Sequence, residues 1–438
     1  MQHRFFYYLI AAVLLPCPLR VLAKTSWSFG ADLKLEEVWW PKRYGESTDQ
    51  DLLRLELLPN ASAKFSDASR LTIKPELFLD PLNNSPEERV FFDPGDSFFR
   101  YRKGAFSLQA GSHLVHWGVT DGYNPLDVVN ARQYFDPLHS IKLGAPSLLL
   151  THGTESTELE LIYIPQNRRS ELPGTQSRWL PRKIFIPRSV DNDTVLLLPE
   201  ELRYSYEKRQ TLNSAQDHNL GVRLLWHWGS IDLGFTAFEG ASTFPLIQPI
   251  VTGTVLQISP KVIIQTDPDV VLRSKDYRQR VAGFSWVSSQ WNFLLKYATN
   301  YSQSLGTDPL LPGWTHENIV GLERNFNIGS EGLLVGILQY SFINNEKTND
   351  SNLSVTEIFR RAWMLGGRFS WGDRWTLTAL GLYDSQHESH FQQYSLSRRL
   401  GDIWTLQASA ELFAGRDDTP LGVYTDNDNY RLSLSRSF

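Results

Sequence analysis

The last eleven residues of the chain are Asp428-Asn429-Tyr430-Arg431-Leu432-Ser433-Leu434-Ser435-Arg436-Ser437-Phe438. Tyr430, Leu432 and Leu434 alternate there with polar residues, among them Arg431 and Ser433. A period of two is typical of a β-strand whose two faces meet different surroundings. The stretch therefore predicts a strand with one apolar and one polar face, ending at an aromatic carboxyl terminus.

A terminal strand that ends on Phe438 resembles the closing strand of bacterial outer-membrane β-barrels, although Arg436 interrupts its apolar face near the end. The resemblance implies that the barrel-assembly machinery recognises this strand and that Phe438 is the assembly signal. We also expect the last strand to pair with the first, which closes a barrel.

The beginning of the chain indicates export. Residues 1–23 carry an early positive charge at Arg4, an apolar run and a small residue at Ala23, which is the layout of a cleavable signal peptide. Cleavage after Ala23 leaves residues 24–438, which contain no cysteine and therefore no disulfide. Loss of the two arginines of the signal changes the formal net charge from −5 to −7, which gives no support to nucleic-acid binding.

Alternation continues through the mature chain. Beyond the signal no apolar run is long enough for a transmembrane helix, so a mature chain that spans a membrane would do so as a barrel. A mean hydropathy of −0.31 agrees with this, because a barrel hides every second residue from lipid. At about 20–25 residues per strand and connection, the mature chain predicts roughly 16–18 strands. The clearest alternating stretches are residues 26–36, 53–57, 71–79, 158–163, 220–227, 291–301 and 404–412.

A secreted soluble β-sandwich would alternate as well. Tryptophans near the expected strand ends favour a barrel, since aromatic residues gather at the two membrane interfaces. We therefore predict an all-β fold, a single transmembrane antiparallel β-barrel in the cell outer membrane. The tryptophans in question are Trp39, Trp40, Trp226, Trp228, Trp286, Trp291, Trp371 and Trp375. We expect tight turns at residues 326–329 and 371–374, and polar outer loops at residues 165–194, 302–314, 343–357 and 414–428.

Residues 116–151 break the alternation. Glycine and proline forbid a regular strand in this segment. A turn-rich stretch of this length either stands outside a barrel or folds into its lumen, and we expect it to fold inward.

The same region contains a Trp-Gly pair, an Asn-Pro-x-Asp motif and an Asp-Pro-Leu motif, formed by Gly111, Trp117, Gly118, Asp121, Asn124, Pro125, Asp127, Asp136, Pro137 and Leu138. In these motifs the chain resembles a family of porin-like outer-membrane proteins whose members are mostly uncharacterised. Relatives of that family are linked to efflux partners or to polysaccharide export. The resemblance therefore implies a pore more strongly than it implies a substrate.

Charged residues of the segment are candidates for a pore constriction. Asp121, Asp127 and Asp136, with Arg132 and Lys142, would bring both signs of charge into the lumen, and opposed charges across a narrow pore set its ion preference. The alternative is a structural loop whose carboxylates cap turns.

A second candidate is a basic stripe upstream of this segment. Arg100 and Arg102 alternate with Phe99 and Tyr101, so the two arginines could face the lumen. The alternative is a rim that faces solvent or lipopolysaccharide.

The sequence predicts no metal site, no cofactor and no enzyme. His113 and His116 point to opposite faces of a strand at their spacing, and a third ligand is missing nearby. No serine, histidine and acid form a recognisable hydrolase motif.

Three hypotheses follow for the function. The first is an outer-membrane channel that passes small polar or charged solutes. The second is a dedicated export or efflux conduit for a polysaccharide or lipid-like substrate, with periplasmic transport partners and the inward segment as its gate. The third, the least favoured, is an outer-membrane lipid hydrolase. In all three the expected surroundings are outer-membrane lipid and lipopolysaccharide.

Overall fold

The computed structural model describes residues 25–42, 51–180, 194–197, 199, 201–311, 313–346, 357–417 and 419–438. The predicted signal at residues 1–23 lies outside these residues. In the described part of the chain, no helix is long and apolar enough to cross a membrane.

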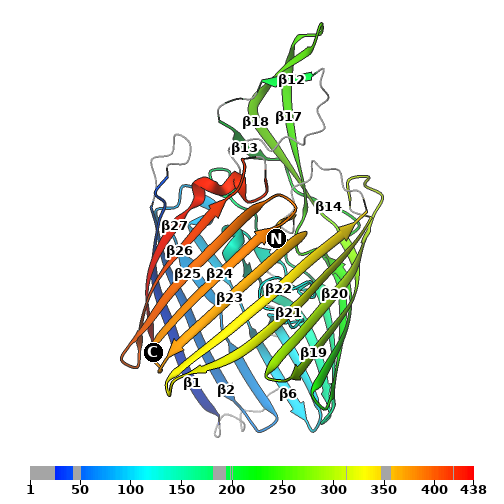
Figure 1. Cartoon of the computed structure of the whole chain (residues 1–438). Helices are drawn as coiled ribbons and strands as arrows, with labels where there is room; N and C mark the ends of the chain where they lie inside the picture. The colour runs from blue at the N-terminus through cyan, green and yellow to red at the C-terminus, as the bar shows by residue number, and fades with distance from the viewer. Residues whose placement is uncertain are drawn as a thin grey trace.

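The chain forms a closed antiparallel β-barrel (Figure 1). Twenty elements join in one sheet, in which β3 with β4, and β5 with β6, each make one interrupted strand, so the wall has 18 strands. The wall strands are β1 (Ser26–Trp39), β2 (Asp51–Lys64), β3 (Ser69–Ile73), β4 (Glu76–Leu79), β5 (Val90–Asp93), β6 (Ser97–Lys103), β7 (Phe106–His113), β10 (Ala145–Gly153), β11 (Thr157–Gln166), β15 (Asp217–Trp228), β16 (Ile231–Ala241), β19 (Arg278–Gln290), β20 (Phe293–Leu305), β21 (Trp314–Ile328), β22 (Gly332–Asn345), β23 (Arg361–Trp371), β24 (Trp375–Asp384), β25 (Ser389–Leu400), β26 (Trp404–Ala414) and β27 (Asn429–Ser437). The prediction of an all-β barrel of roughly 16–18 strands is confirmed.

The last strand closes the barrel. β27 pairs antiparallel with β1, with Leu434 opposite Leu35, and the backbone N–H of Phe438 donates to the carbonyl of Ala31 at 2.9 Å. Every wall strand therefore has a neighbour on both sides, as a membrane barrel requires because lipid cannot satisfy an open edge.

The side chains alternate between lipid and lumen as predicted. On β27, Tyr430 and Leu432 are 45% and 51% exposed on the outer face, whereas Arg431 is 8% exposed on the inner face. Of the predicted interface tryptophans, Trp39, Trp226, Trp228, Trp291, Trp371 and Trp375 are exposed at strand ends and Trp286 is half-buried. The prediction is wrong for Trp40. This residue follows Trp39, whose side chain faces outward, so the ring of Trp40 points inward and is buried, with the guanidinium of Arg178 5.0 Å from its centroid.

The strands are joined by short turns at one end, the turn end, and by longer segments at the other, the loop end (Figure 1). The predicted turn after β23 is confirmed as residues 372–374, where Gly372 has φ +56°. A turn between β21 and β22 is also present, but at residues 329–331 and not at 326–329, because residues 326–328 still belong to β21. Outer-membrane barrels place short turns in the periplasm and long loops outside the cell.

A projecting hairpin at the loop end was not predicted. β17 (Leu246–Gln257) and β18 (Val262–Asp276) leave the wall between β16 and β19 and extend away from the barrel (Figure 1). Parallel pairing of β12 (Thr194–Leu197), β13 (Arg203–Tyr206) and β14 (Gln210–Thr211) with β18 completes a five-stranded sheet.

The remaining elements lie inside the barrel or cover its loop end. They are the short inner strands β8 (Arg132–Gln133) and β9 (Ile141–Lys142) and the 3₁₀ helices η2 (Pro86–Glu88), η3 (Pro137–His139), η4 (Glu357–Phe359) and η5 (Gly422–Asn427). Two apolar cores form where these connections meet the wall, one around Trp117 and Leu126, the other around Phe135 and Leu143.

Candidate functional site

Residues 114–144, here called the inner segment, leave the wall after β7 and return to it at β10. The predicted inward fold is confirmed, since the segment contacts lumen-facing side chains of strands on several sides of the barrel. The predicted range of 116–151 was too long at its carboxyl end, because residues 145–151 belong to wall strand β10.

The Trp-Gly and Asn-Pro motifs form the first bend of the inner segment. Gly118 has φ +109°, and a Cβ at this position would lie 2.0 Å from Oδ1 of Asn124. Nδ2 of Asn124 donates to the carbonyl of Trp117 at 2.7 Å, and Oδ1 accepts from the N–H of Leu126 at 3.1 Å. Only glycine fits the conformation and the space, so these motif residues shape the loop itself.

Apolar side chains fix the inner segment to one side of the wall. Trp117 and Leu126 are 2% and 1% exposed. Both lie against wall glycines: a Cβ on Gly221 would be 2.6 Å from the Trp117 ring, and one on Gly283 would be 2.3 Å from Leu126. Nε1 of Trp117 donates to Glu160 at 3.1 Å, which satisfies the polar atom of this buried ring.

The first predicted carboxylate, Asp121, pairs with the wall. Its Oδ2 lies 2.7 Å from Nζ of Lys296 on β20, and the same Nζ lies 2.8 Å from Glu323 on β21. The N–H of Gly122 donates to Gln339 at 2.9 Å. This cluster carries one net negative charge.

Three other predicted residues come together as expected. Asp127 pairs with Arg132 and, at 2.8 Å, with Lys142. Nζ of Lys142 also donates to the carbonyl of Val115 at 2.8 Å and lies 3.2 Å from Nδ1 of His116. Burial lowers the pKa of Lys142, against the attraction of Asp127. One carboxylate therefore balances two cations, so the cluster has a net positive charge.

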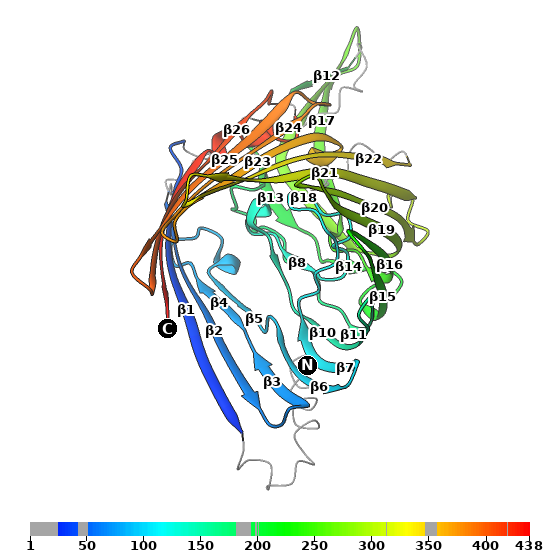
Figure 2. The same ribbon diagram turned by 60° about the horizontal axis from the view of Figure 1, so that its bottom comes forward.

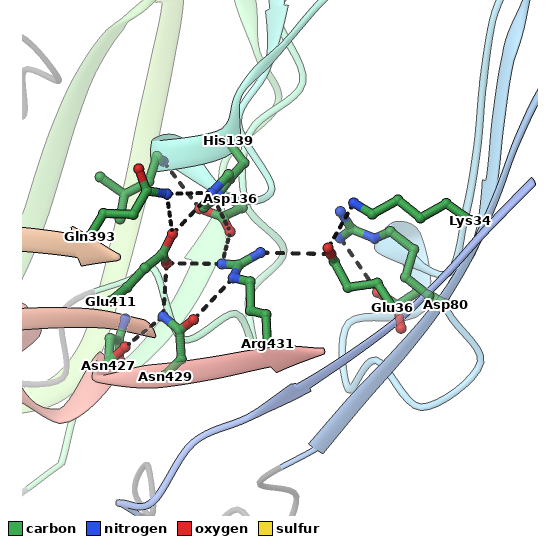
Figure 3. Close-up of polar contacts among 12 residues, drawn as sticks. Lys34, Glu36, Asp80, Asp136, His139, Gln393, Glu411, Asn427, Asn429 and Arg431 are labelled. Carbon is green, nitrogen blue, oxygen red and sulfur yellow. Dashed lines mark hydrogen bonds and ion pairs between the residues drawn. The ribbon is translucent and has the colours of Figure 1, made fainter. Parts of the chain in front are cut away.

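Asp136 lies apart from that cluster, in a network at the barrel seam (Figure 3). Its Oδ2 is 2.7 Å from Arg431 and 3.0 Å from Nδ1 of His139. Glu411 completes the ring, 3.2 Å from Arg431 and 3.0 Å from Nε2 of His139. Asp136 is 8% exposed and Glu411 is fully buried, so each charge depends on its partners.

The seam network stabilises the ionised carboxylate of Asp136 and the protonated ring of His139. Burial opposes ionisation of Asp136, yet His139 and Arg431 hold the pKa of its carboxyl well below the usual range. Burial alone would lower the pKa of His139, but Asp136 and Glu411 raise it to about 9. Both groups are therefore ionised at neutral pH.

Asp136 has a second role, as the N-terminal cap of η3. Its Oδ1 accepts from the N–H of Leu138 at 3.1 Å, as the alternative of a turn-capping carboxylate expects. The ion-pair and capping roles thus coexist in one side chain.

Arg100 and Arg102 are not brought to the inner segment. They lie on β6 near the turn end, on the face opposite to Tyr101, which is 47% exposed toward lipid. They therefore line the lumen wall near the turn end of β6.

Sequence reasoning missed Arg431, Glu411, His139 and Lys296. Arg431 and Lys296 did stand on the polar face of predicted strands, and a long cation on a lumen face is the signal that could have indicated an inner partner. In the described part of the chain, no group of three or more His, Cys, Asp or Glu side chains could hold a metal ion.

No protein-family model matches the sequence, and no curated protein matches it. Among solved structures, OccK2 (OpdF) of Pseudomonas aeruginosa in complex with glucuronate aligns with 94% of this chain and 98% of its own, with a TM-score of 0.51 and 10% identity. OccAB1 of Acinetobacter baumannii aligns with 94% and 96%, with a TM-score of 0.51 and 8% identity. At these identities the likeness shows the fold, which is that of a porin-like barrel of the outer membrane. The narrower family suggested by the Trp-Gly and Asn-Pro motifs stays a prediction.

Proposed function

We propose that the protein is a channel for small polar or charged solutes, with the inner segment as its constriction. The observation that carries the proposal is the polar lumen wall at the turn end. There the lumen faces of β24 to β27 carry hydroxyl and amide side chains, while the lipid faces carry Leu377, Leu396 and Leu434. The lumen-facing residues are Thr376, Thr378, Ser395, Ser397, Gln407, Ser409 and Ser435. A wall of this kind is compatible with water and offers solutes hydrogen bonds.

The inner segment supports a constriction. It reaches β4 and β5 through Phe135 and Leu143, β20 through Asp121, and β27 through Asp136. Contacts on well-separated strands mean that the segment crosses the lumen, so solutes have to pass beside it.

The same crossing favours the second candidate, a gated conduit for a polysaccharide or lipid-like substrate that opens with a periplasmic partner. Passage of a wide substrate would require the inner segment to move, and its charged anchors are the contacts that would have to break. In this candidate the Asp136–Arg431 pair acts as a latch.

A lipid hydrolase receives no support from the serine and histidine that lie together. Oγ of Ser147 is 2.7 Å from Nδ1 of His113, but the two residues are only 6% and 3% exposed. The hydroxyl donates to the carbonyl of Ala145 at 3.0 Å. This pair is enclosed between β7 and β10, out of reach of a lipid ester.

Single-channel recording in planar bilayers tests the proposal. The comparison is between the natural chain and a variant shortened between Asp121 and Lys142. We expect steady conductance steps from the natural chain and larger steps from the variant. Silence from the natural chain with steps from the variant supports the gated conduit, and silence from both contradicts any channel.

A further inference from the structure

A row of cations lies on the lumen face at the turn end, below the inner segment. Lys64 ends β2, Arg70 lies at the start of β3, and Arg100 and Arg102 lie near the end of β6. We call these four residues the basic row. Their strands lie side by side at the turn end that Figure 2 brings forward.

The register brings these charges together. Lys64 is directly opposite Arg70, and Arg70 is directly opposite Arg100. Directly opposite residues have Cβ atoms about 4.5–5.5 Å apart, and like charges at such positions destabilise a sheet. Three cations in one line across three strands therefore lower the stability of the wall, which indicates that their role is not structural.

Alternation puts the row in the lumen. Ile73 on β3 and Tyr101 on β6 are 40% and 47% exposed on the lipid face. Side chains alternate between the two faces of a strand. Arg70 lies three residues from Ile73, and Arg100 and Arg102 flank Tyr101, so all three arginines point inward. Phe98, at the same parity as Arg100, stacks on His113 at 4.9 Å between ring centroids, and His113 is buried on the lumen side.

The row lacks the carboxylate partners that the cations around the inner segment have. Lys142, Lys296 and Arg431 each lie within 2.8 Å of a carboxylate. By contrast, within the residues that the structure describes, no carboxylate lies within ion-pair distance of Arg70, Arg100 or Arg102. Lys64 pairs at 2.6 Å with Asp67, whose side chain is almost fully exposed in the adjacent turn.

The cation on the other side of the barrel next to the inner segment is already neutralised. β21 stands half-way around the barrel from β3 (Figure 2), and beside it Lys296 on β20 is paired with both Asp121 and Glu323. A multiply charged anion in this vestibule is therefore attracted to the basic row more than to Lys296.

We propose that the basic row is a binding site for small soluble solutes that carry two or more carboxylate or phosphate groups. Arginine presents a planar set of donors that matches both groups. Several cations on adjacent strands, about 4.8 Å apart from strand to strand, suit a solute with more than one anionic group. The inference deepens the proposed channel function, on which it rests, by naming the class of solute.

The test uses the full mature chain in detergent micelles, with citrate and pyrophosphate as probes and acetate as the single-charge comparison. Isothermal titration calorimetry is performed on the natural protein, on the double variant Arg70→Gln/Arg100→Gln and on Lys103→Gln. Lys103 is the matched control, because it ends the same strand but pairs opposite Phe106, on the lipid-facing register. The double variant removes a repulsion, so we expect it to fold, and heat-modifiable gel mobility checks this.

We expect the natural protein to bind citrate and pyrophosphate at least about tenfold more tightly than acetate. The double variant should lose about tenfold in affinity, Lys103→Gln should stay within twofold, and binding should weaken from 0.1 to 1 M KCl as salt screens the charges. Equal affinity in the double variant, or no binding of either probe by the natural protein, overturns the site.

Planar bilayers separate this inference from the channel function. Citrate added on the turn side should reduce the current of the natural channel and affect the double variant much less. Citrate binding by a protein that never conducts supports the site and contradicts the channel function. Steady conductance without citrate binding in calorimetry overturns the site and leaves the channel function standing.

Discussion

Arg431 and Asp136 form an ion pair of 2.7 Å between the last wall strand and the inner segment, 295 residues apart in the chain. The pair lies beside the seam where β27 meets β1, and Arg431 also lies 3.8 Å from Glu36 on β1. A single guanidinium thus connects the inner segment with both strands of the closure (Figure 3). The same side chain therefore contacts the inner segment and both strands of the seam.

Replacement of this cation should release the inner segment. In Arg431→Gln, Asp136 and Glu411 stay buried with only His139 to balance them, and loss of one partner of a buried pair costs about 3–5 kcal/mol. We expect frequent transitions between conductance levels in single-channel records, together with a lower temperature of heat-modifiable unfolding. Arg398→Gln is the control, since that arginine lies over the Trp375 ring on the outer face. Quiet records from Arg431→Gln, indistinguishable from those of the control, would show that the pair does not hold the constriction.

Removal of Asp127 should increase the preference for anions. The carboxylate balances both Arg132 and Lys142, so Asp127→Asn leaves two cations without their counter-charge. The reversal potential under a KCl gradient should shift toward that of Cl⁻, and the shift should shrink at high salt. Asp136→Asn should instead act mainly on stability, because Asp136 is enclosed by its partners. An unchanged reversal potential in Asp127→Asn would place this cluster away from the solute path.

Stability should fall in the alkaline range through His139. Its folded-state pKa is raised from 6.5 to about 9, so the stabilisation by its protonated form is complete below pH 6.5 and is lost as the pH rises through 9. The side chain is partly exposed to water, which reduces the effect, and we expect the unfolding temperature to fall by about 1–2 °C between these pH values. His139→Gln should remove this slope. A slope that persists in the variant would assign the pH dependence to another group.

Gly118→Ala should displace the inner segment. The residue has φ +109°, and the new Cβ would meet Asn124 at 2.0 Å, so both backbone strain and a steric clash oppose the native bend. We expect trypsin to cleave at Arg132 in the folded protein, where the natural chain resists. Gly229→Ala is the matched control, because this turn glycine also has a positive φ (+59°) but no atom within 4 Å of the new Cβ. Equal protection of the two variants would mean that the bend tolerates a side chain.

The wall could be predicted from the sequence because every strand meets lipid on one face and the lumen on the other. Apolar and polar residues therefore alternate along each strand, as they do from Tyr430 to Leu434. This alternation cannot separate a wall strand from a hairpin that leaves the wall, which is why β17 and β18 were missed. Trp40 was misplaced for another reason: it was assigned to the interface as a strand-end aromatic residue, whereas the period of two puts it on the face opposite to Trp39, where it covers the guanidinium of Arg178.

The site was predictable in part. Asp127, Arg132 and Lys142 are near in sequence and pair in the structure as a group. The partners of Asp121 and Asp136 are Lys296 and Arg431, on strands far along the chain. These contacts depend on the diameter of the barrel and on the path of the inner segment across it. Neither can be predicted from the residues near Asp121 or Asp136 in the sequence.

The last prediction concerns Phe438. The structure places its ring on the outer surface, 63% exposed, with the guanidinium of Arg436 4.4 Å from the ring centroid. Arg436 also lies 5.2 Å from the Trp404 ring, so the cation that interrupts the apolar face is held between two aromatic rings at the turn end. We propose that an assembly factor recognises this exposed ring.

Deletion of Phe438 should reduce the amount of protein in the outer membrane without reducing its synthesis. The folded barrel loses the backbone hydrogen bond to Ala31 and one exposed ring, which is a small fraction of the stability of an 18-strand wall. A large loss of protein therefore has to arise during assembly. Phe438→Tyr keeps an aromatic terminus and is the control, and immunoblots of outer-membrane and periplasmic fractions provide the measurement. Normal abundance of the deletion variant, with normal heat-modifiable mobility, would show that assembly does not require this terminal residue.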